Sequence, residues 1–202
     1  MGYNSENRKI RIFFSSTFRY LNDERNYLND IIFPDLIRKS RERGVTLTFV
    51  DLRWGITDEK SILEIMHICL QEIDKATPHF IGILAGRYGY VIDDEHIPRG
   101  DEYEKINQKY WELLKRFLEK DRLSLTHIGM ERGVLSNSDP AEYAYFYFKS
   151  EESMAVRETN AEFQKHLNGL KNKIRTPNGI GMKIIAPLKS LAIKSKWTTW
   201  RC

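Results

Sequence analysis

The chain has 202 residues, 41% of them hydrophobic, and a formal net charge of +4. This length suits one domain with a core of its own, without the disulfides or metals on which very small domains depend. No apolar run approaches the roughly 18 residues of a membrane span, and the first residues lack the apolar core of a signal peptide. We therefore expect no membrane partner.

The cysteines and histidines argue against a metal-binding protein, and the charged residues argue against a nucleic-acid-binding protein. Cys69 and Cys202 have no neighbour at metal-ligand spacing, and the five histidines are dispersed. We therefore expect a reduced, cytoplasmic protein without a metal site. Basic residues cluster within 38–43 and 183–196, but acidic residues interleave elsewhere. Such patterns are typical of solvated helix faces, so a nucleic-acid partner is not expected.

Strand-like and helix-like stretches alternate along the chain, each recognised by its apolar period. Strand-like runs cover 10–14, 45–50, 79–84, 144–148 and 182–186. Helical patterns cover 21–37, 57–73, 103–120, 124–135 and 162–174. Pro34 predicts a kink or a break in the first helical stretch, and Gly44 fits a cap after its end. The alternation predicts an α/β domain built on a parallel sheet.

The chain is predicted to have three parts. Residues 1–8 form a disordered or tag-like amino terminus, residues 9–187 hold the alternating elements, and residues 188–202 form a basic tail or edge element. No internal repeat, low-complexity segment or linker interrupts the central part, so we expect a single domain over 9–187.

Three of the strand-like runs end abruptly in a short polar turn. These turns are Ser15–Phe18, Asp51–Gly55 and Ala85–Tyr90. Parallel strands of one sheet end at the same edge, and ligands bind just beyond that edge. We therefore expect the three turns to converge in space and to line a binding site.

The first two turns carry hydroxyl and charged groups suited to a sugar or a phosphate. Ser15, Ser16 and Thr17 stand between a strand end and a helix start, where their hydroxyl and amide groups can meet an anion or a ribose. The same atoms can instead cap the helix. Asp51 can hold a sugar hydroxyl, and Arg53 can bind a carboxylate or phosphate. Alternatively, these two residues form an internal ion pair that orders the loop.

Aromatic and cationic groups extend the candidate ligand site. Trp54 either stacks on a planar base or covers the core. Arg87 and Tyr88 offer a guanidinium and an aromatic face, with the same two interpretations. The chain contains no serine elbow, no phosphate-binding loop and no glycine fingerprint for dinucleotides. These absences argue against the corresponding hydrolases, nucleoside triphosphatases and oxidoreductases.

Four segments together resemble a family of TIR-like domains. They are Arg11–Phe18 with Glu24 and Arg25, Val50–Thr57, Phe80–Tyr90 and Ser124–His127. That family stands at the N-terminus of large STAND-type NTPases with NACHT or NB-ARC modules, and of relatives of nephrocystin and telomerase-associated protein. The resemblance spans roughly 9–187, with the four segments in the expected order.

The resemblance implies a flavodoxin-like, mostly parallel five-stranded sheet with helices on both faces. Active members of the TIR and nucleoside-deoxyribosyltransferase superfamily cleave the N-glycosidic bond of NAD or a related nucleotide. They use a helix-borne glutamate to stabilise an oxocarbenium-like transition state. The frame set by Thr126 and Gly133 puts Gly129 where this glutamate is expected. Glu131 is the nearest carboxylate, but two helical residues rotate it by about 200°, so we expect a solvated or ion-paired residue and keep it as an alternative catalytic residue.

The resemblance leaves two functional hypotheses. In the first, the chain is an effector domain of a STAND-type immune or signalling protein, with NAD or a related nucleotide as substrate or ligand and no required cofactor. The fused or associated NTPase activates it through homo-oligomerisation. In the second, the same fold is a non-catalytic scaffold that acts by homotypic association. Gly129 favours the second hypothesis, and the polar lining of the three turns favours the first.

Overall fold

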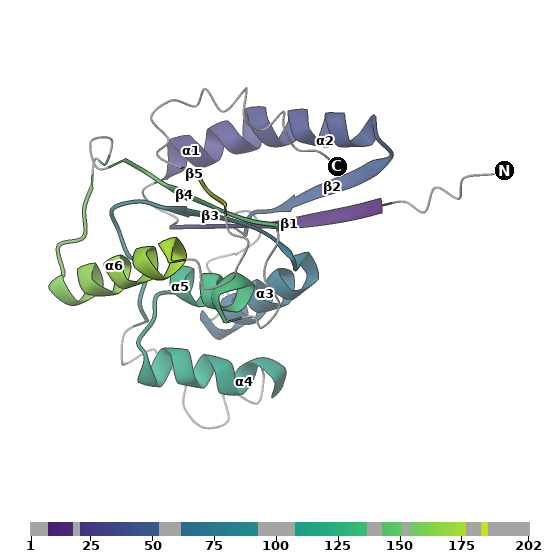
Figure 1. The fold of residues 1–202 in the computed structure, drawn as a ribbon. Helices are drawn as coiled ribbons and strands as arrows, with labels where there is room; N and C mark the ends of the chain where they lie inside the picture. The colour runs from purple at the N-terminus through teal and green to yellow at the C-terminus, as the bar shows by residue number, and fades with distance from the viewer. Residues whose placement is uncertain are drawn as a thin grey trace.

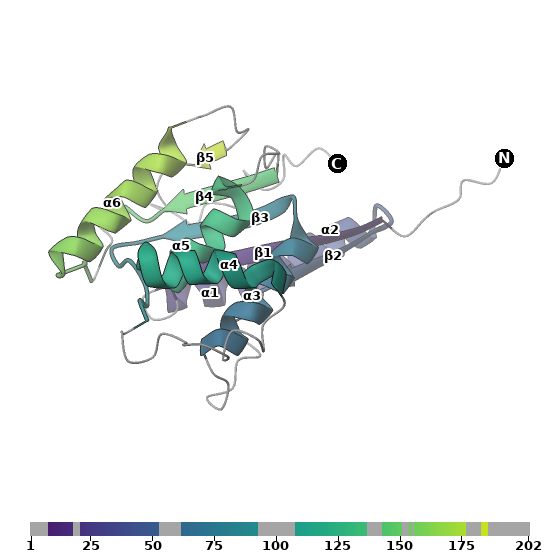
Figure 2. The same cartoon turned by 90° about the horizontal axis from the view of Figure 1, so that it is seen from below.

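The computed structural model describes residues 8–17, 21–52, 62–92, 108–136, 143–150, 154, 156–176 and 183–185. Within these residues the strands form one parallel sheet in the order β2-β1-β3-β4-β5 (Figures 1 and 2). The strands are β1 (Arg8–Ser16), β2 (Val45–Val50), β3 (His79–Leu84), β4 (Tyr143–Phe148) and β5 (Lys183–Ile185). The order is consistent with a flavodoxin-like sheet, in which the direction of the crossovers changes between β1 and β3.

The predicted α/β class with a parallel sheet is confirmed, but two details differ. The strands β1 to β4 form the body of the sheet, whereas β5 covers only three residues at the edge beside β4. The body therefore holds four strands rather than five. In addition, Ser15 and Ser16 are the last residues of β1 and pair in register with Gly82 and Ile83 of β3. They are strand residues rather than turn residues.

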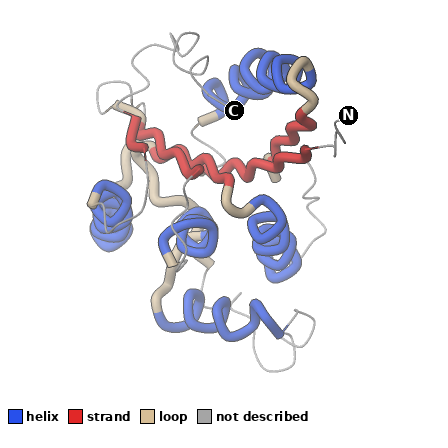
Figure 3. Tube along the Cα trace, turned by 45° about the vertical axis from the view of Figure 1, so that its right-hand side comes forward, coloured by secondary structure: helices blue, strands red, loops and turns tan. Residues whose placement is uncertain are grey.

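Helices cover both faces of the sheet (Figures 1 and 3). One face lies under α1 (Asn22–Tyr27), η1 (Leu28–Ile32) and α2 (Phe33–Arg41). The other face lies under α3 (Ile62–Ala76), α5 (Leu125–Met130), η5 (Glu131–Leu135) and α6 (Ala161–Arg175). A further layer, α4 (Gln108–Lys115) and η4 (Arg116–Lys120), packs on α3 and α5. Among the described helices, none has both the length and the apolar character that crossing a membrane requires.

The first helical stretch passes Pro34 by means of a π turn. Proline has no backbone N–H, and its ring clashes with the carbonyl group four residues earlier in a regular α-helix. The π turn η1 directly precedes α2, and Pro34 stands in the first turn of α2. A π turn removes this conflict locally, so the predicted kink is not a break into separated helices. Gly44, with φ of 70°, ends the stretch in the left-handed conformation, as predicted.

Each face of the sheet buries an apolar cluster of its own. Ile12 and Phe14 of β1 point toward α1 and α2, whereas Phe13 points toward the opposite layer. Phe13 stacks on Phe80 of β3 with ring centroids 5.8 Å apart. This two-sided burial is what a parallel sheet between helices requires, and it holds the carboxyl end of β1 in a rigid setting.

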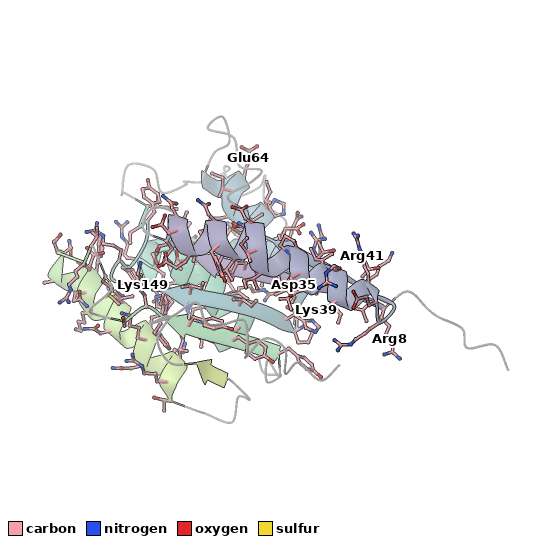
Figure 4. All side chains as sticks on the ribbon, turned by 90° about the horizontal axis from the view of Figure 1, so that it is seen from above. Arg8, Asp35, Lys39, Arg41, Glu64 and Lys149 are labelled. Carbon is pink, nitrogen blue, oxygen red and sulfur yellow. The ribbon has the colours of Figure 1, made fainter. Side chains whose placement is uncertain are left out.

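The outer side of α2 carries charged residues paired at helical spacing. Arg38 pairs with Asp35 and Glu42, and Lys39 pairs with Asp35 at 2.7 Å. Asp35, Lys39 and Arg41 lie along this helix in Figure 4. Hydrogen bonds from Lys39 and Arg38 lower the pKa of the Asp35 carboxyl. The basic cluster at 38–43 thus includes paired charges on a solvated helix face, as predicted.

Several predicted segments lie outside the described residues. They are the amino terminus over 1–7, the first part of the predicted helix over 103–107, and the basic tail over 188–202.

Candidate functional site

A small cavity opens at the carboxyl end of β1, between α1, α3 and α5. Its volume is about 40 Å³, which is room for a few water molecules at about 10–15 Å³ each. Ligands of flavodoxin-like folds bind at this edge of the sheet, near the switch between β1 and β3. The cavity is lined by Phe13, Phe14, Ser15, Ser16, Arg25, Leu52, Ile65, Cys69, Leu125, Thr126 and Gly129.

Ser15 brings a hydroxyl with unused hydrogen-bonding capacity to this cavity. Its side chain is 8% exposed, and its Oγ takes part in none of the hydrogen bonds among the described residues. A β-carbon added at Gly129 would lie 3.6 Å from Ser15 Oγ, so Gly129 faces the serine across the cavity. The structure therefore brings together two residues that the sequence placed in one site.

The first two turns meet through a buried ion pair. The Arg25 guanidinium, 1% exposed, binds the Asp51 carboxylate, and Asn29 Nδ2 donates to the same carboxylate at 3.2 Å. Arg25 Nη1 also donates to Ser16 Oγ at 2.6 Å. Asp51 thus takes part in an internal ion pair, as one of the two alternatives predicted, with Arg25 as its partner. Sequence reasoning named Arg53, which lies outside the described residues, for this role and did not name Arg25.

The sequence pattern around Arg25 indicates that this arginine is buried and needs a partner of opposite charge. Leu21, Arg25, Leu28 and Ile32 recur at helical spacing and are all buried, so the arginine stands on the apolar stripe of its helix. A charge in such a position needs a buried partner of opposite sign. The partner itself cannot be found from spacing, because Asp51 lies 26 positions further along the chain.

Three other residues of these turns were predicted in the site, and only Thr17 can be compared with the structure. Arg53 and Trp54 lie outside the described residues, so their roles stay predictions. Thr17 is 3% exposed, does not line the cavity, and its Oγ1 has no hydrogen-bond partner among the described residues.

The third turn is directed toward α6 rather than toward the cavity. Arg87 Nε lies 3.5 Å from Glu158 Oε2, and the Tyr88 backbone N–H donates to the same oxygen at 3.1 Å. The Glu158 N–H in turn donates to the Gly86 carbonyl at 2.6 Å. Tyr88 is fully buried, and neither it nor Arg87 lines the cavity. The expectation that all three turns line one site is therefore corrected: two of them meet, and Glu158 holds the third elsewhere.

Glu131 faces away from the cavity, as its rotation along the helix predicts. Lys173 Nζ donates to its two oxygens at 2.6 and 2.9 Å, and Ser136 Oγ donates at 2.6 Å. His127 Nε2 lies 3.2 Å from Oε1. Burial alone would raise the pKa of Glu131, but these hydrogen bonds outweigh it and lower the pKa to about 2. Glu131 is ion-paired as expected, and it is buried rather than solvated.

Replacement of Gly129 by alanine is expected to raise the free energy of unfolding by about 1 kcal/mol, the helix-propensity difference between the two residues. The added β-carbon would meet Ser15 Oγ at 3.6 Å and Ile73 Cδ1 at 3.7 Å, both ordinary contacts. Thermal unfolding measures the gain as a rise in Tm of about 2–4 °C. Gly133→Ala is the matched control, because its β-carbon would lie 2.5 Å from the Phe80 ring and should destabilise the fold. A destabilised Gly129→Ala variant would show that Gly129 does not face open space.

The described residues of the cavity include no reactive thiol and no cluster of metal ligands. Burial raises the pKa of the Cys69 thiol to about 12, so the cysteine stays protonated and is a poor nucleophile. Within the described part of the chain, no three His, Cys, Asp or Glu side chains are placed to hold a metal ion. The chemistry available in the described lining is therefore hydrogen bonding by hydroxyl and guanidinium groups beside an apolar wall.

Comparison with known proteins identifies the family. A family model described as a domain of unknown function (DUF4062) matches residues 11–176. The chain is 31% identical to telomerase protein component 1 of Rattus norvegicus over 143 residues, which is 70% of this chain and 5% of that protein. It is 31% identical to a TPR repeat-containing protein of Dictyostelium discoideum over 149 residues (70% and 8%). It is also 27% identical to human NACHT and WD repeat domain-containing protein 2 over 182 residues (83% and 10%).

The chain spans a tenth or less of the length of these three relatives. No solved structure matches it. Because the family model covers most of the alternating strands and helices described above, this chain belongs to the DUF4062 family.

Proposed function

We propose that this chain is a TIR-like domain of a larger STAND-type signalling protein, and that its cavity at the end of β1 is the inner part of a pocket for NAD or a related nucleotide. The strand order and the position of the cavity support this proposal. One relative carries NACHT and WD repeats in its name, and NACHT modules belong to STAND-type NTPases. In this proposal the partner module clusters the domain in the cytoplasm, and oligomerisation activates it.

The observation that carries the ligand pocket is the Ser15 hydroxyl. It is nearly buried, lines the cavity and has no hydrogen bond among the described residues. A ribose hydroxyl is a natural partner, because it both donates and accepts. The cavity of about 40 Å³ is smaller than a nucleotide, since ligand pockets commonly enclose about 300–1,000 Å³. The cavity therefore accommodates only the innermost part of such a ligand.

The described lining supports binding without cleavage. It contains no Asp or Glu, and Gly129 occupies the position where the resemblance places the catalytic glutamate. Cleavage of an N-glycosidic bond builds positive charge on the sugar, which a nearby carboxylate stabilises and a glycine cannot. The Asp51 carboxylate is bound by Arg25 and Asn29, and Glu131 faces the other side of its helix. We therefore propose a pocket that binds a nucleotide without hydrolysing it.

The second candidate function is a non-catalytic scaffold that acts by homotypic association. The small volume of the cavity favours it, as does the ion pair that holds Arg25 on Asp51. In that case the polar groups at the end of β1 stabilise the fold and bind no nucleotide.

Thermal unfolding with NAD or ADP-ribose separates the two candidates. A ligand that binds only the folded chain raises Tm, by an amount that corresponds to about 2.7 kcal/mol at a hundred times its Kd. Ser15→Ala should weaken this shift, since it removes the hydroxyl proposed to hold the sugar. A shift of equal size in the Ser15→Ala variant would place the ligand elsewhere.

Introduction of a glutamate at position 129 tests whether the pocket can support cleavage of NAD. The Gly129→Glu variant is expected to release nicotinamide from NAD, whereas the unchanged chain is not. Gly129→Gln is the matched control, because it has the same size without the charge. Absence of both a ligand shift and activity in Gly129→Glu, even when the chain is fused to an oligomerising partner, would leave the scaffold as the function.

A further inference from the structure

Behind the cavity, four polar side chains form a hydrogen-bonded chain that the proposed function does not use. Tyr88 Oη lies 2.6 Å from His127 Nδ1, and His127 Nε2 lies 3.2 Å from Glu131 Oε1. Lys173 of α6 completes the chain by donating to Glu131. The first three side chains are 0%, 8% and 5% exposed. We call these four residues the α5 relay, because they join the turn after β3 to α5, η5 and α6.

The charge of Glu131 determines where the protons of the relay lie. Its pKa of about 2 keeps it ionised at neutral pH, so the carboxylate accepts hydrogen bonds and donates none. If the imidazole of His127 carries a single proton, the tautomer that fits both contacts has it on Nε2, which leaves Nδ1 as an acceptor for the Tyr88 hydroxyl. Burial raises the pKa of Tyr88 to about 12, so the phenol keeps its proton. The order is thus Tyr88 O–H to His127 Nδ1, and His127 Nε2–H to Glu131.

The relay and the cavity use opposite sides of one short helix. His127 and Glu131 are four residues apart and share the side that meets Lys173, whereas Thr126 and Gly129 are three residues apart and line the cavity. The helix α5 continues directly into the π turn η5, and the two together cover only Leu125–Leu135; backbone hydrogen bonds alone do not stabilise so short a helix. Its rotation must therefore be fixed by side-chain contacts.

We propose that His127 is a positioning residue that holds the rotation of α5, and thereby the approach of Gly129 to Ser15, through ordered hydrogen bonds to Tyr88 and Glu131. The order of the hydrogen bonds and the stability of α5 do not depend on any ligand. Only the consequence for ligand affinity rests on the proposed function. His166 of α6 provides an internal comparison, because it stacks on Tyr88 at 5.4 Å but lies outside the relay.

The tautomer of His127 is the first test and needs no variant. Long-range proton–nitrogen NMR spectra of the full chain near neutral pH should show a protonated Nε2 and a bare Nδ1. A proton on Nδ1 in the neutral ring would overturn the proposed order, because Tyr88 would then have no acceptor and Glu131 no donor from His127.

Amide hydrogen exchange in α5 is the second test. Glu131→Gln keeps an acceptor for His127 Nε2–H, whereas Glu131→Leu has similar size and no acceptor. We expect the amides of Ile128–Met130 to exchange at least about tenfold faster in Glu131→Leu and in Tyr88→Phe, as loss of a buried hydrogen bond predicts. Glu131→Gln should exchange more slowly than Glu131→Leu, because it keeps the acceptor, and the control His166→Asn should stay near the unchanged chain. Equal exchange in the Gln and Leu variants would overturn the positioning role.

The affinity for NAD is the third measurement. Tyr88→Phe should raise the Kd by about tenfold, which equals the loss of 1.4 kcal/mol, although Tyr88 does not line the cavity. Unchanged affinity in this variant would overturn the link between the relay and the pocket. If the unchanged chain binds no NAD, the proposed function fails, and the tautomer and exchange measurements still decide the role of His127.

Discussion

Replacement of Arg25 by methionine is expected to lower the free energy of unfolding by about 3–5 kcal/mol, the usual cost of removing one partner of a buried ion pair. Arg25 and Asp51 have side chains that are 1% and 5% exposed. Without the guanidinium, the nearly buried Asp51 carboxylate and Ser16 hydroxyl lose this charged partner. Thermal and urea unfolding of the full chain measure the effect, and at about 2–4 °C per kcal/mol the Tm should fall by roughly 10 °C.

Two further variants show whether this loss arises from the buried charge. The double variant Arg25→Met with Asp51→Leu removes both charges, and such replacements often recover the stability lost by a single one. Arg38→Ala is the exposed control, since its ion pairs with Asp35 and Glu42 lie in solvent, and it should leave Tm nearly unchanged. A double variant less stable than Arg25→Met would mean that Asp51 stabilises the fold through partners other than Arg25, such as Asn29.

The free energy of unfolding is expected to fall in acid, and part of this fall comes from protonation of Glu131. Its pKa is lowered from 4.5 to about 2 in the folded chain. The carboxylate therefore stabilises the fold at pH values above 4.5, and this contribution is lost as the pH falls toward 2. The difference corresponds to roughly 3 kcal/mol, at about 1.4 kcal/mol for each tenfold change in proton affinity.

Comparison of pH profiles isolates this contribution. Glu131→Gln should be less stable than the unchanged chain at neutral pH, and the two should approach each other as the pH falls toward 2. Glu162→Gln is the matched control on α6, because that carboxyl is 70% exposed. Parallel profiles for the unchanged chain and Glu131→Gln would contradict the strong hydrogen bonding of the carboxylate by Lys173 and Ser136.

The expected and the observed sites differ because some of the residues are positioned by contacts with residues far away in the sequence. Ser15 and Gly129 were both expected in the site, and the structure places them across one cavity. Tyr88 was expected beside them, but its turn is hydrogen-bonded to Glu158, which lies 70 positions further along the chain. The strand that ends before Tyr88 was predicted correctly, since its apolar run is local. The direction of the turn was not predicted, because a contact with a residue as distant as Glu158 produces no periodic pattern in the sequence.

The face of a helix on which a residue lies was easier to predict than the residue with which it forms an ion pair. The rotation of about 100° per residue was enough to separate Glu131 from Gly129, and the structure shows them on opposite sides of α5 and η5. The same geometry would have marked Arg25 as a charge on an apolar stripe. It could not name Asp51, Lys173 or Glu158 as counter-charges, because each of these pairs joins different elements of the fold.

Local sequence patterns were sufficient to predict the α/β class, the approximate positions of the strands and helices, and the edge of the sheet at which polar groups gather. Each of these depends on local periodicity and on the rule that parallel strands end together. The packing of distant elements was needed to show that two turns meet and the third does not, that Arg25 binds Asp51, and that Gly129 faces Ser15. Those outcomes depend on which distant side chains can satisfy a buried charge or donor, and that is settled when the elements pack.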